Sequence, residues 1–407
     1  MNELVITNYK NHTICAVYED QTMVQVSAFQ NMETFLGNIY IGRVDNVVKN
    51  INAAFVNIGD KISCYLDLSS VEGAIFTKKQ SKKKVSIGDE IIVQVTKDAV
   101  KTKAPVVSTN FSLTGKHVVL IHHGDGIQLS KKITNKAQRA QLKEVAIPFS
   151  SLEYGIVLRT NAQFAAEAEI LSELEEVRNT YHEILSQAMH RVKYTLLYKE
   201  LPEYLKQLRD LKEFTLAKIT TNLPKVYDEI CEYLKQHPMK TDAELSVPVC
   251  LADHDNNLGI LYKINHYMEQ ALHRLVYLKS GATIVIEPTE ALTVIDVNTG
   301  KAVSGKKTSE DTFYRINLEA AKEIAAQIRL RNISGIIIID FINMTKKEYK
   351  EQLVDQLRAY LDKDPVQTEF VEITKLGLVE LTRKKTNKTL AEQLEEHKST
   401  EKGEVNL

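Results

Sequence analysis

Two runs of apolar residues in the last third of the chain each end on an aspartate. Leu292-Thr-Val-Ile precedes Asp296, and Gly335-Ile-Ile-Ile-Ile precedes Asp340. Runs of this length are typical of strands in a sheet that helices bury. Between them, residues 310–329 place apolar side chains at every fourth position, as one face of a helix requires. The pattern therefore predicts a strand, a helix and a second strand.

A crossover of this kind places both strands in one parallel sheet, with their carboxyl ends at the same edge. We therefore expect Asp296 and Asp340 to lie close together, with Asn298 two residues beyond the first of them. Paired carboxylates suit Mg²⁺, which takes oxygen ligands, keeps several waters and commonly binds substrate phosphates. The competing interpretation is structural, because an aspartate after a buried strand often forms a turn or caps a helix.

Between residues 37 and 114 the pattern changes to short alternating strands separated by turn residues. Five such strands predict a small antiparallel barrel. The run Lys78-Lys79-Gln-Ser-Lys82-Lys83-Lys84 lies in this region, where it is either a solvated loop or a basic patch for nucleic acid.

Further strands and long helices follow the predicted barrel. Residues 112–121 and 154–161 have the pattern of strands, and the second contains Arg159 and Thr160 at its end. A guanidinium fork beside a hydroxyl suits a terminal phosphate, although a salt bridge is the commoner use of a lone arginine. The remaining predicted elements are helices at 164–198, 202–211 and 224–235 and a strand at 214–219.

Three segments together resemble the catalytic core of the ribonuclease E/G family of bacterial endoribonucleases. They are Asp296-Val-Asn298-Thr-Gly300, the helix over residues 317–331, and Ile339-Asp340-Phe-Ile. The resemblance implies that Asp296 and Asp340 hold the catalytic Mg²⁺, for which Mn²⁺ can substitute, and that Asn298 supports the scissile phosphate. The chain departs from the family at Asn343, where a second aspartate is common.

The same resemblance extends to RNA-binding residues. Residues 37–68 are similar to the oligonucleotide-binding barrel of the ribosomal S1 type, which stacks single-stranded RNA on aromatic rings. It implies that Phe55 and Tyr65 stack bases and that Lys103 lies near the catalytic centre; the alternative for each aromatic is a place in the core. The family's pocket for a 5′-monophosphate corresponds here to Gly115, Val119, Arg159 and Thr160.

The resemblance also gives a domain plan for an α/β multidomain chain. It consists of a ribonuclease H-like subdomain (1–35 and 207–276), an inserted OB-type β-barrel (36–114), a 5′-sensor region with a helical extension (115–206), a deoxyribonuclease I-like nuclease domain (277–390) and a charged tail (391–407). The ribonuclease H-like subdomain is expected to be structural, because a fold name does not imply an active site.

Composition agrees with an intracellular enzyme. The four cysteines are scattered without a C-x-x-C pair, which argues against a zinc ribbon or a disulfide framework. No leader pattern or bilayer-length apolar run is found, so we expect a cytoplasmic protein without a membrane partner. The family's zinc-linking motif is missing, so neither zinc nor a zinc-linked dimer is expected, and the oligomeric state stays open. The net charge of −1 is low for an RNA binder, although basic patches are compatible with it.

These observations predict a magnesium-dependent endoribonuclease that cleaves single-stranded RNA, favours 5′-monophosphorylated substrates, leaves 5′-phosphate products and acts in rRNA processing and mRNA decay. One alternative is a non-catalytic RNA-binding or ribosome-assembly factor that retains the nuclease fold. A second is a phosphodiesterase for a small molecule, which would have no use for Phe55 or a basic barrel loop.

Overall fold

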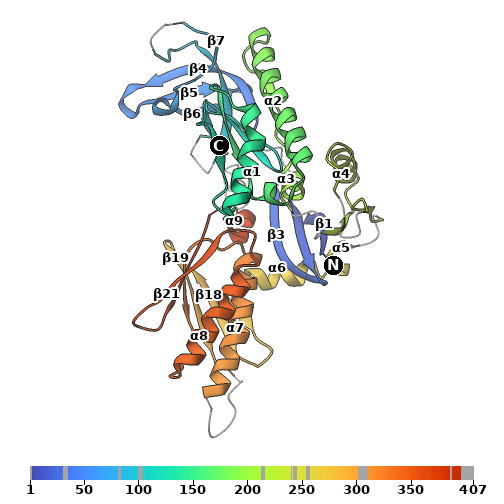
Figure 1. Cartoon of the computed structure of the whole chain (residues 1–407), viewed down its shortest axis with the longest axis vertical. Helices are drawn as coiled ribbons and strands as arrows, with labels where there is room; N and C mark the ends of the chain where they lie inside the picture. Colours follow the sequence, from blue (N-terminus) through green and yellow to red (C-terminus); the bar gives the residue numbers. More distant parts are fainter. Residues whose placement is uncertain are drawn as a thin grey trace, which may run out of the picture. The chain divides into compact units, whose positions relative to one another are not determined.

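The computed structural model describes residues 2–30, 35–80, 84–99, 104–211, 216–239, 241, 245–253, 257–300, 310–385 and 387–395 (Figure 1). Lys103, Lys82 and Lys83 therefore lie outside the described residues. The chain divides into two compact units, of which the first comprises Met1–Asn31 with Glu213–Leu407 and the second Met32–Lys212. The second unit is thus inserted in the sequence of the first.

The second unit contains a closed β-barrel, as the alternating pattern predicted, although one of its strand pairs is parallel and not antiparallel. Its strands are β4 (Ile39–Val48), β5 (Ala53–Asn57), β6 (Ser63–Asp67), β9 (Val106–Ser108) and β8 (Glu90–Lys97), and pairing of β8 with β4 closes the ring. Alternate side chains such as Val56, Leu66 and Val93 fill the interior. Gly42 is required for this packing, because a Cβ there would lie 2.4 Å from Val56 Cγ1. Short strands β7 (Phe76–Lys78) and β14 (Leu196–Tyr198) extend the sheet.

A second sheet of this unit packs against two helices. It has the order β10 (Ser112–Thr114), β11 (Val118–His122), β13 (Tyr154–Leu158) and β12 (Ile127–Leu129), and it shares a core with α1 (Lys136–Ala146) and α2 (Glu167–His190). The buried residues of α2 recur at alternating spacings of three and four: Ile170, Leu174, Val177, Tyr181, Ile184 and Ala188.

The helix predicted over residues 164–198 is shorter in the structure. It ends at His190, and the chain turns through Tyr194, whose φ is +72°, before β14 pairs with β4. Arg191, directly after the helix, has extended backbone angles (φ −105°, ψ 159°), so helical hydrogen bonding stops there. The helix predicted over 202–211 is present as α3 (Glu203–Asp210).

The first unit begins with a mixed five-stranded sheet. Its order is β16 (Val249–Leu251), β15 (Leu216–Thr221), β1 (Asn2–Tyr9), β2 (His12–Glu19) and β3 (Thr22–Gln30). β1 runs parallel to β15, so strands more than two hundred residues apart are neighbours. Helices α4 (Pro224–Gln236), α5 (Leu258–Leu261) and α6 (Ile264–Leu272) accompany this sheet. Its description as ribonuclease H-like stays a prediction.

The first unit also holds a six-stranded sheet, which contains both aspartate-ended strands. Its order is β17 (Leu275–Tyr277), β18 (Thr283–Pro288), β19 (Leu292–Asn298), β20 (Gly335–Asp340), β22 (Val379–Arg383) and β21 (Thr368–Ile373). β19 and β20 are parallel and are connected through α7 (Glu310–Leu330), which confirms the predicted strand, helix and strand. α8 (Lys347–Leu361) lies beside α7 (Figure 1). The short α9 (Leu390–Glu395) follows.

The apolar runs of these strands are buried on alternate residues only. Ile337 and Ile339 are inaccessible and pack with α7 and α8, whereas Ile336 is 49% exposed. The sequence had suggested strands covered by helices; in the structure the side chains between the buried positions of β20 are partly or largely exposed. Within the described part of the chain, no helix combines the length and apolarity needed to traverse a bilayer.

Candidate functional site

Asp296 and Asp340 lie directly opposite each other on neighbouring parallel strands. They are register partners at the carboxyl ends of β19 and β20, where adjacent strands are about 4.8 Å apart. Ile295 and Ile339 are buried in the core, so the two aspartates face the opposite, accessible side of the sheet. The structure therefore brings the two predicted carboxylates together.

The Asn298 carboxamide orients one of these carboxylates. Asn298 Nδ2 donates a hydrogen bond of 2.7 Å to Asp296 Oδ2. Because side chains two residues apart share a face, Asn298 belongs to the same edge as the aspartates. Two residues on, Gly300 has φ +50°, and a Cβ there would lie 2.5 Å from the carbonyl oxygen of Gly281. Glycine thus permits the close turn that follows Asn298.

This donor set fits a hard divalent cation. Mg²⁺ needs one or two protein carboxylates, with waters and phosphate oxygens completing the shell, and Mn²⁺ accepts the same ligands. Among the residues with described positions, no three His, Cys, Asp or Glu side chains come together as a metal cage. Asp296 and Asp340 are the residues that would hold Mg²⁺ at this edge.

Phe55 and Tyr65 form an aromatic pair on the outside of the barrel. They are register partners on β5 and β6, with ring centroids 6.3 Å apart and an interplanar angle of 82°. Both are partly exposed, whereas the next residues, Val56 and Leu66, are buried. The alternation excludes the core placement considered for these aromatics and leaves them accessible to a ligand.

The four residues predicted to bind a 5′-phosphate gather at one end of the β10–β13 sheet. Arg159 Nη1 donates to the carbonyl oxygen of Gly115 at 2.6 Å and to Asp210 Oδ1 at 2.7 Å. Thr160 Oγ1 is 2.8 Å from Ser130 Oγ, and Val119 pairs with Val157 on β13. The salt bridge considered for Arg159 is therefore present.

Asp210 is a charged partner shared by two arginines. Burial alone would raise the pKa of its carboxyl, but hydrogen bonds and charge from Arg159 and Arg209 hold that pKa below its usual value. Arg209 also donates to the carbonyl oxygen of Thr114 at 2.7 Å. The network fixes Arg159 and keeps Asp210 ionised at neutral pH.

Gly115 is packed against a partly buried glutamate. A Cβ at this position would lie 1.8 Å from Glu173 Oε1, so only glycine fits. Glu173 accepts hydrogen bonds from the backbone N–H groups of His117 and Val118 and lies 2.7 Å from His117 Nδ1. Burial would raise the pKa of Glu173, but these hydrogen bonds lower it overall. Glu173 thereby holds the turn between β10 and β11.

Two models of known protein families match this chain. The Ribonuclease E/G family model matches residues 112–386, and the S1 RNA binding domain matches residues 33–110. The first match covers more than half of the chain. The chain belongs to the ribonuclease E/G family.

The alignments with similar proteins extend over most of the chain of this family member. It is 34% identical over 391 residues to Ribonuclease E of Synechocystis sp., which covers 94% of this chain and 57% of the relative. It is 31% identical over 368 residues to Ribonuclease G of Escherichia coli K12, with 87% and 74% covered. Ribonuclease G of Haemophilus influenzae is 32% identical over 401 residues, with 95% and 80% covered. The chain thus spans little more than half the length of the Synechocystis relative.

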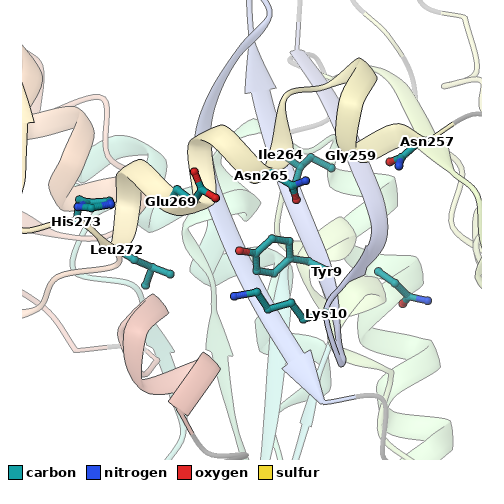
Figure 2. Close-up of a pocket in the computed structure, with 10 residues that line it drawn as sticks. Tyr9, Lys10, Asn257, Gly259, Ile264, Asn265, Glu269, Leu272 and His273 are labelled. Atoms are coloured by element: carbon teal, nitrogen blue, oxygen red, sulfur yellow. The ribbon is translucent and has the colours of Figure 1, made fainter.

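A separate hollow of about 580 Å³ lies in the first unit, between the β1–β2 turn and α6 (Figure 2). Tyr9 is the last residue of β1, Lys10 follows it in the turn, and Asn265 and Glu269 come from the helix. Its lining includes none of the candidate catalytic residues of this ribonuclease E/G family member, so it is distinct from the carboxylate edge.

Sequence reasoning missed the residues that support the family's candidate sites. Asp210 lies 51 positions from Arg159, and no local pattern links them. Asn317 is fully buried on α7 and bonds the backbone of Ile342, just beyond Asp340. A polar residue within the apolar stripe of a helix was the one available signal for Asn317.

Proposed function

We propose that this ribonuclease E/G family member is a magnesium-dependent endoribonuclease that cleaves single-stranded RNA. The observation that carries the proposal is the direct pairing of Asp296 with Asp340, with Asn298 bonded to the first carboxylate. The S1 match and the exposed aromatic pair of the barrel support an RNA substrate. We place its function in RNA processing and decay, including rRNA processing and mRNA decay, in the cytoplasm.

The chemistry is hydrolysis of a phosphodiester bond. Asp296 and Asp340 would hold Mg²⁺, which would supply positive charge to phosphoryl oxygens and lower the pKa of a coordinated water. The hydrogen bond from Asn298 restricts the orientation of the Asp296 carboxylate before substrate arrives. This carboxylate therefore loses less conformational freedom when the cation and RNA bind. Attack by water with departure of the 3′ oxygen leaves the phosphate on the 5′ end of the downstream product.

The 5′-monophosphate preference rests on the geometry around Arg159. The hydrogen bonds that Arg159 makes within the described residues all use Nη1. Its Nε and Nη2 groups can therefore donate to phosphate oxygens, as a guanidinium fork does. The hydroxyl of Thr160 and the backbone around Gly115 and Val119 would complete the pocket.

The experiment uses a fluorogenic single-stranded oligonucleotide carrying either a 5′-monophosphate or a 5′-hydroxyl. We expect Mg²⁺-dependent cleavage that EDTA stops and Mn²⁺ restores, faster for the monophosphate. RNA binding without metal-dependent cleavage would contradict the proposal and favour the RNA-binding or ribosome-assembly alternative. Mapping the cleavage sites on total RNA then identifies the substrates.

A further inference from the structure

The segment of residues 341–346 joins Asp340 to α8 and is held by side chains of α7. Asp340 is the last residue of β20, so the strand ladder fixes the chain only up to this carboxylate. Beyond it, Phe341 and Met344 are buried in the core that α7 and α8 share with the sheet. The polar backbone of this segment needs partners of its own.

Asn317 supplies such partners from the middle of α7. Its Nδ2 donates to the carbonyl oxygen of Ile342 at 2.7 Å, and its Oδ1 accepts from Ile342 N at 3.1 Å. The side chain is fully buried, so both ends of the carboxamide are satisfied away from water. One amide therefore replaces the strand partner that Ile342 would have if β20 continued.

Glu310, the first residue of α7, holds the other end of the segment. Its Oε1 accepts hydrogen bonds from Thr345 N, from Thr345 Oγ1 at 2.8 Å and from Lys346 N at 2.6 Å. These donors lower the pKa of Glu310, the backbone N–H of Lys346 most strongly, so the carboxylate is ionised at neutral pH. The partners of Glu310 are three and four residues beyond Ile342.

We propose that Asn317 and Glu310 are positioning residues that fix the Asp340 carboxylate for cation binding beside Asp296. The inference rests on the proposed function, because it concerns the same cation. Because Asp340 ends its strand, the direction of its side chain depends on how the following segment is held. Asn317 and Glu310 make the hydrogen bonds that hold this segment. Groups that orient metal ligands without touching the metal commonly change metal affinity or activity 10- to 100-fold when they are removed.

The test measures Mn²⁺ binding to the full chain by electron paramagnetic resonance, alongside thermal melting and steady-state cleavage. We expect Asn317→Ala and Glu310→Ala each to weaken Mn²⁺ binding about tenfold or more. In both variants the kcat for RNA cleavage should fall as Mn²⁺ binding weakens, whereas the KM for RNA should stay within about twofold of the wild-type value. Glu310→Gln keeps an acceptor oxygen at the same place, so it should restore most of the affinity.

Gln327→Ala is the matched control for loss of a buried amide on the same helix. Gln327 accepts a hydrogen bond of 2.7 Å from Arg331 Nε, and it lies ten residues, or about 15 Å, along α7 from Asn317. Its loss should lower the melting temperature and leave Mn²⁺ affinity within about twofold. Unchanged affinity in both α7 alanine variants, or an equal loss in Gln327→Ala, overturns the inference.

Two further outcomes separate this inference from the proposed function. If Asn317→Ala does not fold, the partly exposed Glu310 carries the test through its alanine and glutamine variants. If the wild-type chain binds Mn²⁺ without cleaving RNA, the proposed function fails, and the Mn²⁺ affinities of the variants still decide for or against the positioning role.

Discussion

A single carboxamide sets the direction of a candidate metal ligand. Asn298 donates to one oxygen of Asp296, and among the described residues the other oxygen accepts no hydrogen bond on the face that Asp340 shares. Arg159 is held in a similar way, with one nitrogen bonded to Gly115 and Asp210. At both positions the side chain is partly fixed before a ligand binds, so less conformational entropy is lost on binding.

Replacing Asp296 by asparagine should abolish cleavage. The substitution keeps the side-chain shape but removes a negative charge from the cation site, so several kcal/mol of transition-state stabilisation are lost. That loss corresponds to about a thousand-fold or more in kcat. Single-turnover cleavage measures it, while melting and fluorescence anisotropy with RNA should remain close to wild type. Retained cleavage would refute the metal role of Asp296.

Replacing Arg159 by glutamine should reduce the preference for a 5′-monophosphate. A charge-assisted hydrogen bond is worth about 1.5–3 kcal/mol, so the preference should fall about 10- to 100-fold. The measurement is the ratio of kcat/KM for monophosphorylated and hydroxylated oligonucleotides of one sequence. The hydroxylated substrate is the internal control, and an unchanged ratio removes the sensor assignment.

Single residues differ in how far the sequence could place them. Asp296 and Asp340 were predictable as neighbours, because each ends an apolar run and one amphipathic helix connects them. Asp210 was not, since its contact with Arg159 depends on how α3 packs. The end of α2 at His190 was missed because the residue that ends it, the extended Arg191, is neither a glycine nor a proline.

At the scale of elements, the strands β5 and β6 act together as an aromatic surface. Their pairing sets Phe55 opposite Tyr65, so two rings are presented on adjacent strands of one curved sheet. Stacking on such rings tolerates any base, because every base has a π face. The barrel is therefore suited to hold RNA without reading its sequence.

Truncating Phe55 to alanine should weaken single-stranded RNA binding by about 1–3 kcal/mol, as loss of one stacked base predicts. Tyr65→Phe is the matched control, since it keeps the ring and should bind normally. Anisotropy titrations at one fixed salt concentration measure both. Equal affinity of Phe55→Ala and wild type would contradict the stacking role.

A buried histidine connects the barrel to α2. His122 lies 2.8 Å from the carbonyl oxygen of Gly73 through Nε2 and 2.8 Å from the Tyr181 hydroxyl through Nδ1, and its ring stacks on Phe111. Burial lowers the pKa of His122; the hydrogen bond with Gly73 and the charge of Glu153 oppose this shift, and the charge of His123 adds to it. The folded state therefore favours the neutral ring.

The stability of this connection should depend on pH. Unfolded histidine has a pKa of about 6.5. The contribution of the neutral His122 ring to the free energy of unfolding is complete above that pH. It is lost as the pH falls through that value toward the lower pKa of the folded state. Urea midpoints from pH 7.5 to 5.5 should decline in the wild type and decline less in His122→Gln. Parallel curves for the two proteins would contradict the assignment.

At the scale of the whole molecule, the candidate catalytic residues and the candidate RNA-binding residues belong to different compact units. The carboxylate edge belongs to the first unit, whereas the aromatic pair and the Arg159 network belong to the second. Each unit has hydrophobic clusters of its own. Independent cores of this kind allow a unit to fold alone.

A fragment of residues 35–211 should therefore fold cooperatively, bind single-stranded RNA and cleave none. Its two sheets bury their own cores, and it lacks both carboxylates that are proposed to bind the metal. Circular dichroism melts and anisotropy titrations measure folding and binding. A fragment that does not melt cooperatively would show that the second unit depends on the first.

The parallel register of β19 and β20 has a consequence for how this protein can vary. Successive strand residues point to opposite faces, so one residue inserted within β20 would turn the Asp340 carboxylate into the core that the sheet shares with α7 and α8. Added turns in the crossover would leave the pairing intact. An insertion or deletion within β20 therefore preserves the direction of Asp340 only if it changes the strand by an even number of residues, whereas the length of the connection between β19 and β20 does not affect that direction.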